Sequence, residues 1–256
     1  MVNMGLPSLT SIRAAAEREL ADFQAALRPK SVIEIEPGFY TYRYHPPGGQ
    51  VRVHLRVDAK RNGVLFVDVT DVVYLNPTAT LIAKSALENV SADDIERRLI
   101  IGAKRRDRRQ IRDDVAAVYG MVRRFTEPNS GCATCALDNV KRADLFAASI
   151  HAPFKADLAI TYECNNDCPH CYNEVDRHAL KAMPLDDWKT VVDRLTEVGV
   201  PHLIFTGGEA TLYNDLPELI AHADAQGPIC GLNSNGRRFS FGGYANELKS
   251  AGLNHL

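Results

Sequence analysis

Cys164, Cys168 and Cys171 lie within one eight-residue segment and are the residues best suited to metal chemistry. A loop of this length can curl so that the three thiolates converge, and thiolates are soft ligands that suit iron–sulfur centres. A cubane cluster normally takes four cysteines, so three leave one iron open to chelate a small molecule through its amino and carboxylate groups. The alternative is a zinc site completed by His170 or His178.

Gly207, Gly208 and Glu209 follow a short apolar segment and form a second candidate binding loop. Two adjacent glycines let a backbone pass close to a ligand without a Cβ clash. The carboxylate can accept hydrogen bonds from an ammonium group. The competing interpretation is an ordinary turn that ends in a surface glutamate.

Ser234 and Asn235 follow a third apolar segment, where they could bind a ligand or simply form a glycine-terminated turn. Cys132 and Cys135 form a separate CxxC pair. That pair could be half of an auxiliary cluster, half of a zinc site, or a dithiol, and the sequence leaves these roles open. Cys230 lies within an apolar segment and is expected to be an inert core residue.

The segments after residue 156 alternate between short apolar stretches and amphipathic stretches. We expect strands at 157–162, 202–206, 229–233 and 253–256, and helices at 185–198, 216–225 and 244–251. This alternation predicts βαβ units and a parallel sheet. The three candidate loops would then meet at the carboxyl edge of that sheet, where ligands bind in such folds.

The residues before 127 show a different pattern, which predicts a separate small α+β domain. A helix is expected at 8–28, three short antiparallel strands at 32–44, 51–58 and 64–68, and further helices after Asn76, after the capping box at Ser91, and at about 107–125. The predicted boundaries are an N-terminal helix (1–31), this domain (32–126), a connector with the CxxC pair (127–155) and the α/β part (156–256).

The CxxxCxxC segment resembles the motif of the radical SAM superfamily, and Gly207, Gly208 and Glu209 match that family's GGE motif. The resemblance implies a partial (β/α) barrel in which the three cysteines hold a [4Fe-4S] cluster. It implies that the open iron binds S-adenosylmethionine, whose reductive cleavage yields a 5′-deoxyadenosyl radical. The cofactors carry this chemistry, so no separate catalytic side chain is assigned.

The same resemblance implies roles for the remaining candidate residues. His170 takes the position before the last cysteine, which lies near the adenine in the family, and Tyr172 follows that cysteine as in many members. The GGE residues would contact the amino group of S-adenosylmethionine. Ser234 and Asn235 would meet its ribose or carboxylate.

Residues 32–101 resemble the peptide-binding chaperone of pyrroloquinoline quinone biosynthesis (PqqD-like) and the related RiPP recognition elements, which have a winged helix-turn-helix-like fold. This resemblance rests on residues 72–79 and 90–95 and implies a leader peptide that adds as a strand to the sheet edge. The rival interpretation is DNA binding, which the basic run at 104–109 would favour. Acidic residues flank that run, so a nucleic acid partner is not expected.

The formal net charge of −2 over 256 residues gives no general attraction to nucleic acid or to acidic membranes. No apolar run is long enough to span a bilayer, and no secretory signal is recognisable, so a cytoplasmic protein is expected. That reducing compartment also suits clustered thiolates.

The chain is expected to be a radical SAM enzyme that modifies a peptide or a peptide-derived substrate, with a reductant such as flavodoxin or ferredoxin. The family's barrel usually has more βα units than the segment 157–256 can supply, so we expect a shortened core or a second chain that completes the barrel. The alternatives are a non-catalytic peptide-binding scaffold and a DNA-binding, cluster-sensing regulator.

Overall fold

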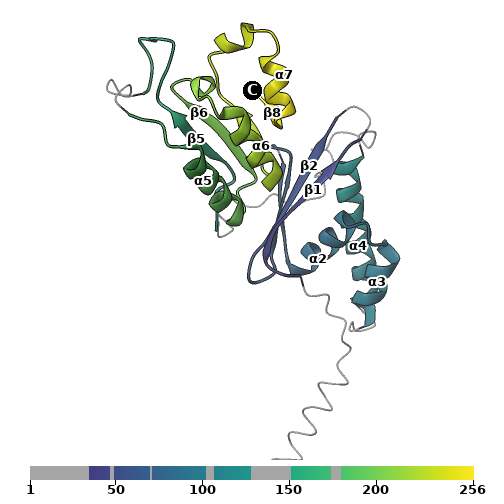
Figure 1. Ribbon diagram of the computed structural model, residues 1–256. Coiled ribbons are helices and arrows are strands. Elements are labelled where there is room, and N and C mark those ends of the chain that lie inside the picture. The colour runs from purple at the N-terminus through teal and green to yellow at the C-terminus, as the bar shows by residue number, and fades with distance from the viewer. Residues whose placement is uncertain (1–34, 47–48, 70, 102–106, 128–150, 174–179) are drawn as a thin grey trace, which may run out of the picture.

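The computed structural model describes residues 35–46, 49–69, 71–101, 107–127, 151–173 and 180–256 (Figure 1). Two four-stranded sheets organise these residues, one in an N-terminal unit (residues 35–127) and one in a C-terminal unit (residues 151–256). The expected helix at 8–28, Cys132, Cys135 and His178 lie outside the described residues. No helix within the described part of the chain is long and apolar enough to cross a membrane.

The N-terminal unit is an antiparallel sheet of order β1-β2-β3-β4 followed by three helices. The strands are β1 (Gly38–Tyr44), β2 (Val51–Val57), β3 (Gly63–Val67) and β4 (Asp71–Leu75), and the helices are α2 (Pro77–Leu87), α3 (Ala92–Ile101) and α4 (Arg108–Thr126). One face of the sheet, with Val53, Leu55 and Leu65, packs against α2 and α4 in a shared apolar core.

The predicted helix starts of this unit are confirmed. The Asn76 side chain accepts a hydrogen bond from the Ala79 amide at 2.8 Å, and Pro77 occupies the first turn of α2, where its missing N–H is no loss. Ser91 precedes α3, and its Oγ accepts from the Asp94 amide at 3.1 Å. These two caps explain why the helices begin at these residues.

The prediction of three strands was wrong by one, because β4 also belongs to the sheet. Val73 and Leu75 are buried whereas Val72 and Tyr74 are exposed, which is the alternation expected of an edge strand. The sequence interpretation treated this stretch as the approach to α2. The first strand also begins at Gly38, later than the expected residue 32.

The C-terminal unit is a parallel sheet of order β5-β6-β7-β8, which confirms the predicted α/β class. Its strands are β5 (Ala156–Thr161), β6 (His202–Gly207), β7 (Ile229–Leu232) and β8 (Leu253–His255), and its helices are α5 (Leu185–Glu197), α6 (Leu216–Gln226) and α7 (Tyr244–Ser250). One sheet face, with Ile160, Leu203 and Phe205, packs with the helices in one apolar core. Two short 3-10 turns, Ala210–Leu212 and Arg237–Ser240, were not predicted.

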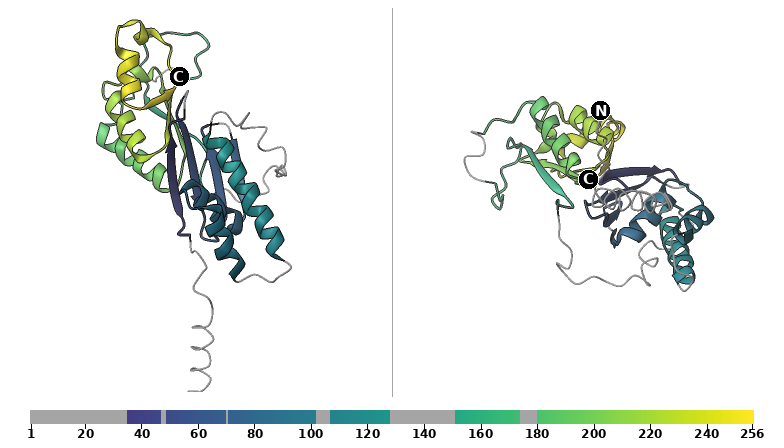
Figure 2. Two further views of the ribbon diagram at one scale, coloured as in Figure 1. Left: turned by 90° about the vertical axis from the view of Figure 1, so that its right-hand side faces the viewer. Right: turned by 90° about the horizontal axis from the view of Figure 1, so that it is seen from below.

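The N-terminal sheet lies between its own helices and the C-terminal unit (Figure 2). Arg52, His54 and Arg56 alternate along β2 and point away from the N-terminal core. Arg52 Nη1 donates to the carbonyl of Gly227 at 3.2 Å, and Arg56 Nη1 donates to the carbonyl of Gly199 at 3.2 Å. These carbonyls follow the ends of α6 and α5, where the helix dipole favours a cation. The buried Arg52 also pairs with Asp224 at 2.7 Å.

The fully buried His54 links the two units through its Nε2, which donates to the carbonyl of Gly227 at 3.0 Å. Because a carbonyl only accepts, the ring must carry its proton on Nε2. The pKa of His54 is lowered from 6.5 to about 4, chiefly by burial and to a smaller extent by the positive charges of Arg52 and Arg43 and by the neighbouring His202. The hydrogen bond to Gly227 acts in the opposite direction but is outweighed.

We therefore expect the free energy of unfolding to fall as the pH falls from 6.5 towards 4. In this window the unfolded His54 binds a proton and the folded one does not, which amounts to a loss of about 3 kcal/mol at most. Urea unfolding of the wild type and His54→Gln at pH 7 and pH 4.5 measures the effect, because glutamine keeps a donor but does not titrate. A pH dependence of equal size in both proteins would contradict this assignment.

Candidate functional site

Three loops gather at the carboxyl edge of the parallel sheet, towards the upper end of the C-terminal unit in Figure 1. The cysteine segment follows β5, the GGE segment ends β6, and Ser234 and Asn235 follow β7. Parallel strands place all three loops at one edge, as the sequence predicted. Backbone hydrogen bonds join the first two, from the Gly208 amide to the Thr161 carbonyl at 2.9 Å and from the Glu209 amide to the Glu163 carbonyl at 2.8 Å.

The cysteine loop presents three free thiols, with Cys164 half-buried and Cys168 and Cys171 exposed. The Cys171 amide donates to the Cys168 carbonyl at 3.1 Å, so the last two cysteines sit at the two ends of a tight turn. The Asn166 amide points at the sulfur of Cys164, at 3.4 Å. Free thiols on a short loop, with an amide directed at one sulfur, fit the donor set that an iron–sulfur cluster requires.

The zinc alternative requires three or more ligating side chains around one ion. Within the described residues, no three His, Cys, Asp or Glu side chains are grouped so that they could hold one metal ion. His178 lies outside the described residues. A cubane cluster makes a different demand, because each cysteine binds a separate iron atom. Three free thiols on one loop are therefore compatible with a cluster.

Gly207 and Gly208 are required by the packing of the protein chain against itself. A Cβ on Gly207, whose φ is 137°, would lie 1.9 Å from the Thr161 carbonyl oxygen. A Cβ on Gly208 would lie 2.4 Å from the Glu163 carbonyl oxygen. Both distances are far below contact, so only glycine lets the end of β6 approach the start of the cysteine loop. From the sequence we expected a ligand to lie close to these glycines. In the structure, the close neighbour of Gly207 is the end of β5.

Glu209 is buried, with 1% of its surface exposed, and its carboxylate joins the second and third loops. Oε1 accepts from the Thr211 amide at 3.1 Å, from the Thr211 hydroxyl at 2.6 Å and from the Ser234 hydroxyl at 2.8 Å. Oε2 accepts from the Asn235 amide at 2.6 Å. The carboxylate thus holds Ser234 and Asn235 in place, and its predicted contact with S-adenosylmethionine stays a prediction.

Asn235 extends this network to the cysteine loop, because its Nδ2 donates to Asn165 Oδ1 at 2.7 Å. Arg237 Nη1 donates to the Asn165 carbonyl at 2.6 Å and to Asn166 Oδ1 at 2.9 Å. Asn173 Nδ2 donates to the Gly207 carbonyl at 3.3 Å. These four residues, Asn165, Asn166, Asn173 and Arg237, were not identified from the sequence, although Asn165 directly follows Cys164 and Arg237 directly follows an Asn-Gly turn.

His170 and Tyr172 lie on the exposed side of the cysteine loop, and Tyr172 is 83% exposed. Their predicted positions near the adenine stay predictions. Cys230 is completely buried in β7, and burial raises the pKa of its thiol to about 12. A buried, protonated thiol is a poor ligand and a poor nucleophile, so Cys230 fits its predicted role as a core residue.

Residues 158–256 match the family model described as the Radical SAM superfamily. The matched residues begin in β5 and include the cysteine loop, the GGE segment, Ser234 and Asn235. The C-terminal unit is therefore similar to proteins of this superfamily. The match also supports the two cofactors expected for it, a [4Fe-4S] cluster and S-adenosylmethionine.

The chain is also similar to curated proteins named PqqA peptide cyclase. The protein of Xanthomonas campestris pv. campestris (strain B100) is 35% identical over 112 residues, which are 43% of this chain and 29% of the relative. That of Bradyrhizobium diazoefficiens is 37% identical over 117 residues, again 43% of this chain and 29% of the relative. The chain therefore spans under a third of the length of the relatives that it matches.

Two solved structures of Streptococcus suis SuiB are similar at a lower level. One is bound to the precursor peptide SuiA and the other to S-adenosylmethionine, with TM-scores of 0.44 and 0.43. Both share 15% sequence identity and cover 72% of this chain and 41% of SuiB. At these TM-scores and this sequence identity, we infer nothing about this chain from SuiB.

Proposed function

We propose that this protein is a radical SAM enzyme that modifies a peptide or a peptide-derived substrate. The observation that carries the proposal is the meeting of three loops, one with three free thiols, at the carboxyl edge of a parallel sheet. The family match over residues 158–256 supports it. Because the thiols must stay reduced to bind iron, we place the protein in the cytoplasm.

In this proposal Cys164, Cys168 and Cys171 hold a [4Fe-4S] cluster through their sulfurs. The bound cluster and S-adenosylmethionine supply one-electron cleavage to a 5′-deoxyadenosyl radical. The chain's own residues bind and orient these groups. The network from Glu209 through Asn235 keeps the second and third loops aligned with the cysteine loop.

We assign the contacts with S-adenosylmethionine to the GGE segment and to the loop that follows β7. The backbone of Gly207, Gly208 and Glu209 contacts the amino group of S-adenosylmethionine. The Glu209 side chain is not used for this contact, because its carboxylate already accepts a hydrogen bond from the Asn235 amide. Ser234 and Asn235 face the ribose or carboxylate.

Anaerobic reconstitution with iron and sulfide tests the proposal directly. The reconstituted protein should show broad visible absorption, and dithionite with S-adenosylmethionine should release 5′-deoxyadenosine. A reductant such as flavodoxin or ferredoxin should replace dithionite. A protein that binds one zinc and no iron would refute the proposal. A protein that takes up the cluster and binds peptide but releases no 5′-deoxyadenosine would favour the scaffold alternative.

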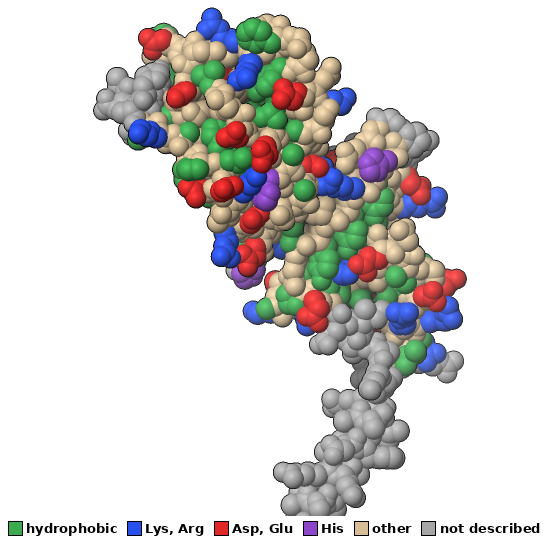
Figure 3. Space-filling model, in the orientation of Figure 1, with side chains coloured by type: hydrophobic (Ala, Val, Ile, Leu, Met, Phe, Trp, Pro, Cys, Tyr) green, Lys and Arg blue, Asp and Glu red, His purple; other side chains and the backbone are tan. Residues whose placement is uncertain are grey.

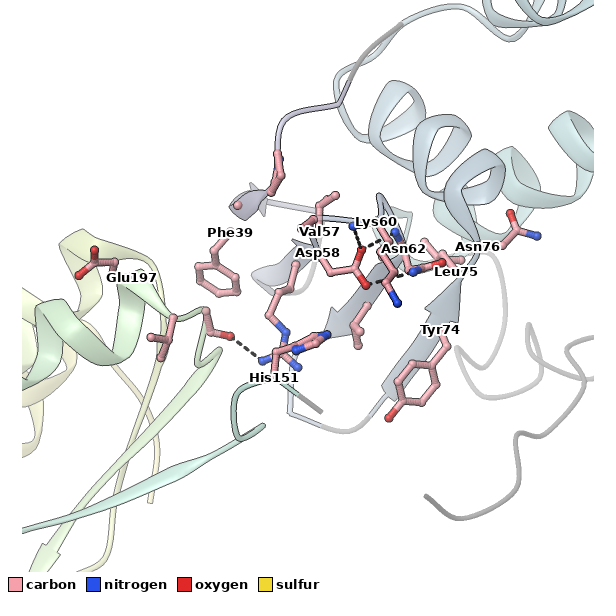
Figure 4. A pocket seen from close by; sticks show the side chains of 18 residues that line it. Phe39, Val57, Asp58, Lys60, Asn62, Tyr74, Leu75, Asn76, His151 and Glu197 are labelled. Atoms are coloured by element: carbon pink, nitrogen blue, oxygen red, sulfur yellow. Dashed lines mark hydrogen bonds between the residues drawn. The ribbon is translucent and has the colours of Figure 1, made fainter. Parts of the chain in front are cut away.

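The peptide partner is assigned to β4, which is an edge strand of the N-terminal sheet. Its outward side chains Val72 and Tyr74 are 37% and 41% exposed, and an edge strand offers unpaired backbone groups to an added strand. Tyr74 also lines a cavity of about 900 Å³ between the two units. Figure 4 shows Tyr74 on one side of this cavity and Glu197 of α5 on the other.

We expect Tyr74→Ala to weaken the binding of a leader peptide about tenfold, because an exposed tyrosine at the centre of an interface is a typical binding hot spot. Fluorescence polarisation with labelled candidate peptides measures the affinity. Ile101→Ala, which removes an exposed apolar side chain of α3, is the matched control and should bind as the wild type does. Equal affinities for all three proteins would remove β4 as the binding edge.

DNA binding is the competing role of the N-terminal unit. Acidic and basic side chains are interspersed on the face shown in Figure 3. In the N-terminal unit, Arg97 pairs with Asp94 and Arg112 pairs with Glu96. A DNA-binding protein needs a basic surface that follows the phosphates. A salt-dependent gel shift with duplex DNA would revive this alternative.

A further inference from the structure

We propose that Arg237 is a positioning residue that holds the cysteine loop in its cluster-binding form before the cluster arrives. This inference rests on the proposed function and goes beyond it, because Arg237 lies outside the three motifs. The residue belongs to a different loop from the cysteines and reaches them across the carboxyl edge of the sheet.

The guanidinium of Arg237 contacts the cysteine loop directly. Its Nη1 donates to the Asn165 carbonyl at 2.6 Å and to Asn166 Oδ1 at 2.9 Å. Both acceptors lie between Cys164 and Cys168, in the part of the loop that sets the separation of these two sulfurs. A cationic donor makes stronger hydrogen bonds than a neutral one, so the contact restrains the loop although it is exposed.

The backbone of Arg237 is itself anchored by hydrogen bonds. Its amide donates to Asn235 Oδ1 at 3.0 Å, and its carbonyl accepts from the Ser240 hydroxyl at 2.8 Å. Gly236, with φ of 81°, precedes it and starts the short 3-10 turn Arg237–Ser240. The guanidinium therefore projects from a backbone that is fixed at both sides.

The contacts of Arg237 continue into the buried part of the site. The carboxylate of Glu209 holds the Asn235 amide, and the Asn235 side chain holds Asn165 Oδ1. Asn165 is thus held twice, by Asn235 at its side chain and by Arg237 at its carbonyl. The cysteine loop is tied to the sheet by a chain of contacts that needs no bound cofactor.

The consequence is preorganisation. A loop that must become ordered when it binds its ligand loses conformational entropy at that moment, and a loop that is already ordered does not. Removing Arg237 should loosen the empty loop and weaken the uptake of the cluster, while the fold and the identity of the ligands stay the same.

The test compares the wild type with Arg237→Ala, Arg237→Lys and, as the matched control, Arg194→Ala. Arg194 is an exposed arginine of α5 that pairs with Glu197 of the same helix and does not contact the cysteine loop. In the apo-protein, hydrogen exchange of residues 162–172 and the rate at which iodoacetamide alkylates Cys164 and Cys168 are measured. After reconstitution with limiting iron and sulfide, iron per chain is measured.

We expect exchange and alkylation in Arg237→Ala to be at least about fivefold faster, which is the effect of losing one ordinary hydrogen bond, because both bonds of the guanidinium are lost; the iron content should also be lower. Arg237→Lys should recover part of both, and Arg194→Ala should match the wild type. Asn166→Ala, which removes one acceptor from the other side, should shift in the same direction even where Arg237→Ala folds poorly. Wild-type exchange and alkylation rates in both Arg237→Ala and Asn166→Ala would overturn the inference. A wild-type protein that takes up no iron would instead refute the proposed function.

Discussion

Replacing any one of Cys164, Cys168 and Cys171 with alanine is expected to reduce the iron content of the reconstituted protein to the background level. Three thiolates are already one fewer than a cubane normally receives, so two cannot retain the cluster. Formation of 5′-deoxyadenosine should be lost with it. Iron and sulfide analysis, together with chromatography of the reaction products, measures both effects.

Cys230→Ala is the matched control for these three variants, because Cys230 is also a free cysteine of the C-terminal unit. It lies buried in β7 and should lower the free energy of unfolding by about 1 kcal/mol without changing the iron content. Full cluster occupancy in any of the three loop variants would show that the ligands have been misassigned. The apo forms of the Cys168 and Cys171 variants should unfold like the wild type, since both side chains are exposed.

The second large effect is expected for Glu209→Ala, which should lower the free energy of unfolding by about 3 kcal/mol or more. Thr211, Ser234 and Asn235 all donate to the buried carboxylate, and alanine would leave those donors without an acceptor. Urea unfolding of the anaerobic apo-protein measures this loss. Because the same carboxylate aligns the loop after β7, the affinity of the loaded protein for S-adenosylmethionine should also fall.

Glu218→Ala separates this effect from a general effect of losing a glutamate. Glu218 is exposed on α6 and pairs with Lys189, and an exposed ion pair contributes little. This variant should unfold and bind S-adenosylmethionine as the wild type does. If Glu209→Ala behaved in the same way, the hydrogen-bond network would not organise the site.

Much of the fold could be predicted because the hydrophobic periodicity is strong. In α5, Trp188 and Val192 are buried one helical turn apart, and polar residues separate them in the sequence. This periodicity made the helix recognisable. β4 escaped prediction because it runs directly into Asn76, the cap of α2. Its pairing with β3 depends on a turn at Asp68, whose φ of 49° is not readable from residue type.

The site could be predicted in outline but not in its connections. The spacing of the cysteines and the position of the GGE segment after a strand placed three loops at one edge. The sequence could not show that Glu209 is buried and engaged by Ser234 and Asn235, because that depends on how the loops after β6 and β7 pack together. The same is true of Arg237, whose partners lie about 70 residues earlier in the chain.

The contact between the two units could also not be predicted from the sequence. Arg52, His54 and Arg56 follow the alternation of a strand with one polar face, which is ordinarily exposed to water. Here that face meets the carbonyls that follow α5 and α6, and Arg52 and His54 are buried. Only the tertiary arrangement shows that these polar residues belong to an interface.

Electron paramagnetic resonance of the reduced, reconstituted protein, recorded with and without S-adenosylmethionine, tests the central claim most directly. We predict the signal of a reduced [4Fe-4S] cluster and a clear change in that signal when S-adenosylmethionine is added, because the cofactor binds the iron that Cys164, Cys168 and Cys171 leave open. A cluster signal that S-adenosylmethionine does not alter, or the absence of any iron signal, would contradict the account.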